Sequence, residues 1–210
     1  MIYFIGGPPR CGKTTMAKQM SKQLQIPWIS CDTLEVISGA YMTKNEWDKA
    51  HPYSLLRRIH KTNDQFYEAL SPQKIVSVLK KQARATFAAI DMMTICEIKD
   101  GNDYIIEGYH LEPRFIQSLM KKYGKKNLKA VFLTKMDAEK FAQDVHKSIT
   151  PNDWLILGTK KKENFVRVGQ MVFWYSHMLE KEAEKYGFPV LCMDQEFSKQ
   201  LQKGIVGLTR

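Results

Sequence analysis

Residues 7–14 read Gly7-Pro8-Pro9-Arg10-Cys11-Gly12-Lys13-Thr14 and match the pattern G-x-x-x-x-G-K-[ST]. A short apolar run over residues 2–5 precedes the match, and a helical pattern over residues 13–24 follows it. Glycines let backbone N–H groups turn inward, and the start of a helix directs further N–H groups and a positive dipole end at an anion. The stretch therefore predicts a loop that holds the phosphates of a nucleotide.

Individual side chains of this loop have predicted tasks. Lys13 should reach the β- and γ-phosphates, and the Thr14 hydroxyl should bind magnesium. Arg10 is a second candidate for stabilising charge. We expect ATP with magnesium to contact a continuous stretch made of Gly7, Pro8, Pro9, Arg10, Cys11, Gly12, Lys13, Thr14 and Thr15. The sequence leaves the choice between ATP and GTP open.

Apolar runs and helical patterns alternate along the rest of the chain. Strands are predicted at residues 2–5, 27–30, 103–107, 128–133 and 188–193. Helices are predicted at residues 13–24, 71–99, 113–122, 137–147 and 163–186, with short helices over the site in the region 35–69 and a turn or helix start at 150–153. Strands separated by helices imply an α/β fold with a parallel sheet and helices on both faces. Ligands bind at the carboxyl ends of such strands.

Composition narrows the class of protein. The chain has 210 residues, 44% of them hydrophobic and 26% charged, which suits one globular domain with or without a mobile insert. No apolar run of about 18 residues is present, so no membrane span is expected. The first predicted strand begins at Ile2, which leaves no room for a targeting segment.

The cysteines indicate a reducing compartment, and we expect a cytoplasmic protein. They are far apart and form no C-x-x-C pair, which argues against a zinc site and a disulfide framework: Cys11, Cys31, Cys96 and Cys192. Cys11 fits the loop as a small residue. A redox role is the alternative, because a helix N-terminus can lower the pKa of a thiol.

The net charge of +10 attracts anions in general. Nucleic acid is one candidate partner, and a nucleotide together with a phosphorylated or acidic small molecule is another. The sequence has no platform of interleaved aromatic and basic residues for single strands, so we do not expect nucleic acid. The oligomeric state stays open.

Three side chains follow predicted strands and could act beside the phosphate loop. Asp32 could accept or position the proton of an attacking hydroxyl, or cap a helix that starts at Thr33. Glu107 could hold magnesium through water, hold a group of the acceptor, or cap the next element. His110 could face the acceptor or lie on the loop with a structural role.

These residues also carry a family resemblance. The loop, Asp32 after a short second strand, and the strand Tyr104-Ile105-Ile106-Glu107-Gly108 resemble the small-molecule P-loop kinases, a group that includes adenylate, shikimate and gluconate kinases and chloramphenicol phosphotransferase. Residues 105–113 are most similar to the 2-phosphoglycerate kinase-like branch. The resemblance implies a single domain over residues 1–210 and a five-stranded parallel sheet in the order 2-3-1-4-5. It also implies an acceptor-covering region at about residues 35–100 and a lid at about residues 150–170.

Cationic side chains are expected to stabilise the transferred phosphoryl group and to hold an anionic acceptor. The catalytic candidates are Lys13, Asp32 and Arg167, and the acceptor-binding candidates are Asp32, Arg57, Arg58, Arg84, His110 and Arg114. The lid carries lysines at 160–162 where adenylate kinases have spaced arginines, so the lid cation that enters the site is not fixed. Four aromatic residues are predicted mainly as core and helix-packing residues: Trp154, Phe173, Trp174 and Tyr175.

The leading hypothesis is therefore an ATP- and magnesium-dependent kinase that phosphorylates a hydroxyl of a small, anionic metabolite. One alternative is a nucleotide-binding switch or ATPase without a small-molecule acceptor, although no guanine-selecting N-K-x-D motif is present. Another is a polynucleotide 5′-kinase, suggested by the charge. The sequence does not identify the acceptor.

Overall fold

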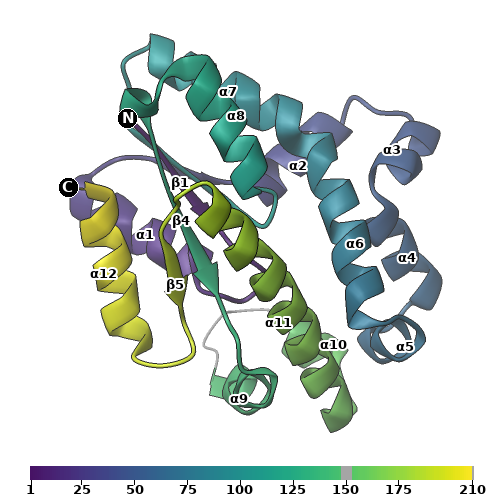
Figure 1. The fold of residues 1–210 in the computed structure, drawn as a ribbon. Helices are drawn as coiled ribbons and strands as arrows, with labels where there is room; N and C mark the ends of the chain where they lie inside the picture. Colours follow the sequence, from purple (N-terminus) through teal and green to yellow (C-terminus); the bar gives the residue numbers. More distant parts are fainter. Residues whose placement is uncertain (148–152, 210) are drawn as a thin grey trace.

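A computed structural model describes residues 1–147 and 153–209. Its centre is a parallel sheet of the strands β1 (Ile2–Gly6), β2 (Trp28–Ser30), β3 (Tyr104–Gly108), β4 (Leu128–Thr134) and β5 (Val190–Cys192). The strand order is β2-β3-β1-β4-β5, which confirms the predicted order. The chain thus forms the expected α/β architecture (Figure 1).

Helices surround this sheet. They are α1 (Lys13–Leu24), α2 (Cys31–Gly39), α3 (Lys44–Ala50), α4 (Pro52–His60), α5 (Asn63–Ala69), α6 (Pro72–Ala83), α7 (Phe87–Lys99), α8 (Pro113–Tyr123), α9 (Ala138–Asp144), α10 (Trp154–Gly158), α11 (Lys162–Lys185) and α12 (Phe197–Thr209). Helices α1 and α12 cover one face, and α7, α8 and α11 cover the other (Figure 1). Helices α3 to α6 lie together at one side of the molecule.

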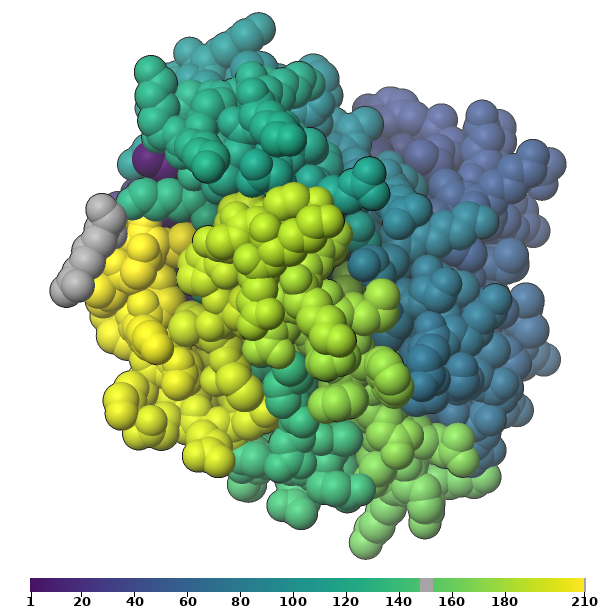
Figure 2. Space-filling view, in the orientation of Figure 1, coloured from purple at the N-terminus to yellow at the C-terminus, as the bar shows by residue number. Residues whose placement is uncertain are grey.

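The sheet is the core of the domain. Strands β1 and β3 are almost entirely buried, as expected for parallel strands covered on both faces. Figure 2 shows α11 filling the middle of one face of the molecule, between α12 and the region of α5 and α6. In the part of the chain that is described, no helix combines the length and the apolar character needed to span a membrane.

The predicted helix over residues 71–99 is wrong as a single element. Helix α6 ends at Ala83, a 3-10 helix follows at Arg84–Thr86, and α7 begins at Phe87. The two helices have different partners, because α6 packs on α11 and α4 whereas α7 packs on α2 and α8. A 3-10 turn shifts the helical spacing of apolar residues only slightly, so the pattern concealed the break. The predicted helix over 137–147 likewise ends in a 3-10 turn, Val145–Lys147.

The prediction of short helices in the region 35–69 is confirmed, and local capping explains their bounds. Ser30 caps α2, since its side chain accepts a hydrogen bond from the Asp32 N–H at 3.2 Å. Thr43 and Glu46 form a capping box at α3, and Thr62 caps α5. Of the turn or helix start expected at 150–153, residues 150–152 lie outside the described residues, and Asp153 caps α10.

Candidate functional site

The phosphate loop joins β1 to α1 at the carboxyl edge of the sheet. Gly7 and Gly12 have φ angles of 146° and 93°, in the region that side chains disfavour. A Cβ on Gly7 would lie 2.4 Å from the carbonyl oxygen of Leu133, so the loop can pass this close to β4 only with glycine there. No side chain of the described residues caps α1, so its first N–H groups are available to an anion.

Lys13 closes over this loop. Its side chain is largely buried, and its Nζ donates a hydrogen bond to the Pro8 carbonyl oxygen at 2.8 Å. The ammonium group therefore lies inside the curve of the loop, where a phosphate chain would replace the carbonyl as its partner.

Cys11 does not have the properties of a redox thiol. It is fully buried, and burial raises the pKa of its thiol to about 12, against the opposing charge of Lys13. A thiol that stays protonated is a poor nucleophile. Burial and a protonated thiol therefore favour the interpretation of Cys11 as a small residue inside the loop.

The two predicted metal-binding residues meet in the structure. The Thr14 hydroxyl donates to Glu107 Oε1 at 2.9 Å, although the residues are far apart in sequence. The sheet brings them together, because β3 pairs with β1 and aligns Glu107 with Ile5. Glu107 is only 2% exposed, and a buried carboxylate needs a partner.

Thr14 and Glu107 fit a magnesium ion by their chemistry. Both offer oxygen atoms, which Mg²⁺ prefers, and Mg²⁺ usually keeps several waters and substrate phosphates as ligands. Among the described residues, no group of three or more His, Cys, Asp or Glu side chains could hold a metal ion. A site of few protein ligands completed by phosphate oxygens is therefore the kind that this edge of the sheet can form.

Asp32 lies beside these residues, in the first turn of α2, with a side chain that is 73% exposed. Its predicted alternative role as a helix cap is wrong, because Ser30 caps the helix. The nearest partner of its carboxylate is the fully buried His110, whose Nδ1 lies 3.9 Å from Asp32 Oδ1. The structure thus brings two acceptor-site candidates together.

Behind His110 lies a buried carboxylate that the sequence analysis missed. Glu35 Oε2 accepts a hydrogen bond from His110 Nε2 at 2.6 Å and one from the Tyr109 hydroxyl at 3.1 Å. Its Oε1 accepts from Gln82 Nε2 at 2.7 Å. The one sequence signal was weak: Glu35 follows Asp32 by three residues, which puts both on one side of a helix.

The arginines predicted for the acceptor or the phosphates do not converge. Arg10 Nη1 contacts both oxygens of Asp153, at 2.5 and 2.6 Å, and so links the loop to the start of α10. Arg57 donates to Asn63, and Arg58 pairs with Asp48. Two further candidates are both exposed, on α8 and α11 respectively: Arg114 and Arg167.

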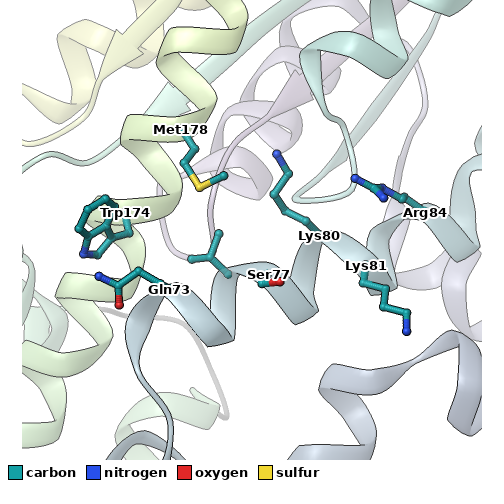
Figure 3. A pocket seen from close by; sticks show the side chains of 8 residues that line it. Gln73, Ser77, Lys80, Lys81, Arg84, Trp174 and Met178 are labelled. Carbon is teal, nitrogen blue, oxygen red and sulfur yellow. The ribbon is translucent and has the colours of Figure 1, made fainter.

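Arg84, the first residue of the 3-10 helix after α6, lines an open groove of about 510 Å³ between α6 and α11 (Figure 3). The other lining residues are Gln73, Val76, Ser77, Lys80, Lys81, Trp174 and Met178. None of them comes from the phosphate loop or from a strand end, so Arg84 as an acceptor ligand stays a prediction. Of the aromatic residues predicted for the core and for helix packing, Tyr175 is buried and Phe173 is half-buried, whereas Trp174 and Trp154 are 37% and 43% exposed and so do not belong to the core.

The predicted lid is held against α5. Asn63 Nδ2 donates to the Trp154 carbonyl and to Thr159 Oγ1, each at 3.0 Å. The Asp64 carboxylate accepts from the backbone N–H groups of Lys160 and Lys161, at 3.0 and 3.3 Å. The Lys161 ammonium pairs with Glu68 at 2.6 Å. The segment therefore contacts α5, part of the region predicted to cover the acceptor, through several polar bonds.

Comparison with known proteins places this geometry in a family context. The model of the ATPase family associated with various cellular activities (AAA) matches residues 3–146. A 2-phosphoglycerate kinase of Pyrococcus furiosus is 28% identical over 122 residues, which are 56% of this chain. The match covers 37% of that relative, so the chain spans well under half of its length.

Solved structures share the fold. A gluconokinase from Sinorhizobium meliloti superposes with a TM-score of 0.54 at 12% identity, covering 100% of this chain and 91% of that one. A shikimate kinase from Bacteroides thetaiotaomicron superposes with a TM-score of 0.50 at 16% identity, covering 100% and 96%. The fold class predicted from the sequence is confirmed.

Proposed function

Because the chain belongs to the ATPase family associated with various cellular activities (AAA) and has the fold of the small-molecule P-loop kinases, we propose that it transfers the γ-phosphate of ATP to a hydroxyl of a small molecule. One observation carries the proposal. The pair formed by Thr14 and Glu107, joined at 2.9 Å, stands at the start of α1, and the carboxylate of Asp32 follows the neighbouring strand β2. A kinase needs these two groups side by side, one for the phosphates and one for the hydroxyl.

The phosphate side of the reaction rests on fixed charges. Lys13 and the N–H groups at the start of α1 would stabilise the charge that spreads over the transferred phosphoryl group. Arg10 would hold the loop in register with α10 through Asp153. Thr14 and Glu107 would hold magnesium, which when bound neutralises part of the phosphate charge.

The acceptor side rests on Asp32. The acceptor hydroxyl oxygen bonds to the γ-phosphorus while the bond between that phosphorus and the β–γ bridging oxygen breaks. The hydroxyl proton passes to the Asp32 carboxylate, which stands exposed to the solvent and to a substrate. A positioned base of this kind contributes about 10²- to 10⁴-fold to a rate.

Three observations support an anionic acceptor. The chain has a net charge of +10, and the similar protein from Pyrococcus furiosus is named for a phosphorylated acid. The Arg57 guanidinium carbon lies 4.9 and 5.9 Å from the ring centroids of Phe66 and Trp154. Its Nη1 is buried and has no hydrogen-bond partner among the described residues, so an anionic group that reached it would satisfy this donor.

The test is a screen of phosphate acceptors by mass spectrometry with ATP and magnesium. The panel contains 2-phosphoglycerate, gluconate, shikimate and a set of sugar acids and nucleosides. We expect one product that gains a phosphoryl group, and Asp32→Asn should lower its rate by about 10²-fold or more. Transfer at the native rate by Asp32→Asn would remove Asp32 from the mechanism, and the absence of any product would favour the alternative below.

The alternative is an ATPase that acts as a switch, with no small-molecule acceptor. The scattering of the candidate acceptor arginines favours it, since Arg58 is paired with Asp48 and Arg114 and Arg167 are exposed on separate helices. Steady ATP hydrolysis that no member of the panel changes would support this reading.

A further inference from the structure

A buried polar cluster stands directly behind the candidate base Asp32. Glu35 is its centre and receives hydrogen bonds from three side chains, His110 and Tyr109 after β3 and Gln82 of α6. His51 Nε2 lies 3.8 Å from Glu35 Oε1. The cluster provides more hydrogen-bonding groups than a single buried carboxylate needs as partners. Asp32 lies next to the cluster, on the side that faces the solvent.

Glu35 is ionised at neutral pH. Burial by itself would raise the pKa of this carboxyl, but the hydrogen bond and charge of His110, followed by the charge of His51, hold the pKa below its ordinary value. An ionised carboxylate only accepts hydrogen bonds. His110 Nε2, at 2.6 Å from it, therefore carries a proton and donates it.

The second ring nitrogen of His110 is left facing Asp32. Nδ1 is buried and has no hydrogen-bond partner among the described residues, and Asp32 Oδ1 lies 3.9 Å away. Gly108 makes this approach feasible, because a Cβ there would lie 2.6 Å from Cys31 Cβ and 3.2 Å from His110 Nδ1. A buried polar atom without a hydrogen-bond partner lowers the stability of the fold, so the orientation of His110 Nδ1 toward Asp32 needs an explanation.

We infer that His110 is a positioning residue that holds the Asp32 carboxylate through Nδ1, and that Glu35 fixes the ring for this task. The inference rests on the proposed role of Asp32. After Asp32 has taken the hydroxyl proton, the unprotonated Nδ1 can accept a hydrogen bond from its O–H group. When Nδ1 is itself protonated, it attracts the ionised carboxylate. In both states the ring restricts a side chain that is otherwise exposed.

The groups of the cluster around His110 and Glu35 come from four parts of the chain. They are Cys31, Asp32 and Glu35 of α2, His51 between α3 and α4, Gln82 of α6, and Tyr109 after β3; His51 and Gln82 contact Glu35. Asp32 is the most exposed of them, Tyr109 is half-buried, and the others are buried. A substrate hydroxyl therefore reaches this network most directly through Asp32.

Two matched substitutions separate the two nitrogens. His110→Asn keeps a polar atom near the position of Nδ1 and removes the contact with Glu35, whereas His110→Gln keeps a donor near the position of Nε2 and removes the contact with Asp32. Turnover is measured as ATP hydrolysis with water as the acceptor, together with the affinity for ATP and magnesium. We expect His110→Gln to lose about 10- to 100-fold in kcat and His110→Asn about threefold, with unchanged ATP affinity. The opposite ranking, or equal losses, would overturn the inference.

A second measurement keeps the native histidine. Nuclear magnetic resonance of the ¹⁵N-labelled protein reports the two ring nitrogens of His110 separately. We expect a protonated Nε2, and an Nδ1 resonance that moves in Asp32→Asn but not in the exposed control Glu139→Gln. An Nδ1 resonance at the same position in Asp32→Asn and in the native protein would overturn the inference. If Asp32→Asn instead turns over at the native rate while the Nδ1 resonance moves, the contact stands and the proposed catalytic role of Asp32 fails.

Discussion

The phosphate loop and the acceptor-covering region are built by different means. The loop takes its shape from residues adjacent in sequence. Glu107, its partner from a distant part of the chain, is brought next to it by the pairing of β3 with β1. The predicted acceptor-covering region consists of short capped helices held by polar contacts between residues far apart in sequence, such as Gln82 with Glu35. Local sequence therefore shapes the first region, and tertiary contacts shape the second.

The largest expected effect is at the loop. Lys13→Ala should lower turnover by about 10³-fold, because the ammonium group stabilises the transferred phosphoryl group. Unfolding temperature should change little, since the hydrogen bond that Lys13 donates among the described residues goes to the Pro8 carbonyl of its own loop. Lys18→Ala, on the exposed side of the same helix, is the matched control. Equal activity of Lys13→Ala and Lys18→Ala would contradict the role assigned to Lys13 in the phosphate loop.

Glu107→Gln should have the next largest effect. The amide keeps the shape of the side chain but removes the negative charge, so we expect about a 10²-fold loss of turnover and a weaker dependence of ATP binding on magnesium. The measurement is ATP affinity with magnesium and with a chelator, in the native protein and in the variant. A variant whose affinity falls as much on chelation as that of the native protein would remove Glu107 from the metal site.

Glu35→Ala tests the other region through stability. Removing one partner from a buried charged cluster costs about 3–5 kcal/mol of unfolding free energy, measured by urea denaturation. Because the pKa of Glu35 is lowered in the folded state, its contribution is present above its unfolded pKa and is lost as pH falls through the lower folded value. We therefore expect the difference between the native protein and Glu35→Gln to shrink below about pH 4.5. A difference that grows on acidification would contradict the ionised state.

The smallest expected effect concerns the lid. Asp64→Asn weakens the acceptor of the Lys160 and Lys161 amides, and a net hydrogen bond contributes about 1 kcal/mol. Hydrogen exchange of these two amides should therefore quicken by about fivefold. Asp48→Asn, which weakens the pair with Arg58 in another part of the molecule, should leave them unchanged. Unaltered exchange in Asp64→Asn would mean that the lid is held by other contacts.

The difference between these two regions also explains which features could be predicted from the sequence. The alternation of strands and helices predicted a parallel sheet, and the resemblance to the small-molecule P-loop kinases supplied its strand order. The meeting of Thr14 with Glu107 follows from the pairing of β1 with β3 in that order. Asp32 and His110 were identified because each follows a strand.

The features that the sequence did not predict depend on tertiary contacts. Glu35 gave almost no local signal, because its partners Gln82 and His110 are 47 and 75 residues away. The break between α6 and α7 follows from their different packing partners, which a periodic pattern does not reveal. The pairing of Arg10 with Asp153 spans 143 residues and was likewise invisible.

Calorimetric titration of ATP with magnesium tests most directly whether the phosphate loop is assembled to hold a triphosphate. The native protein should bind one equivalent, and the affinity should fall by about tenfold or more in Lys13→Ala, where the ammonium inside the loop is absent. Equal affinities in the two proteins, or no heat of binding in the native one, would contradict the account.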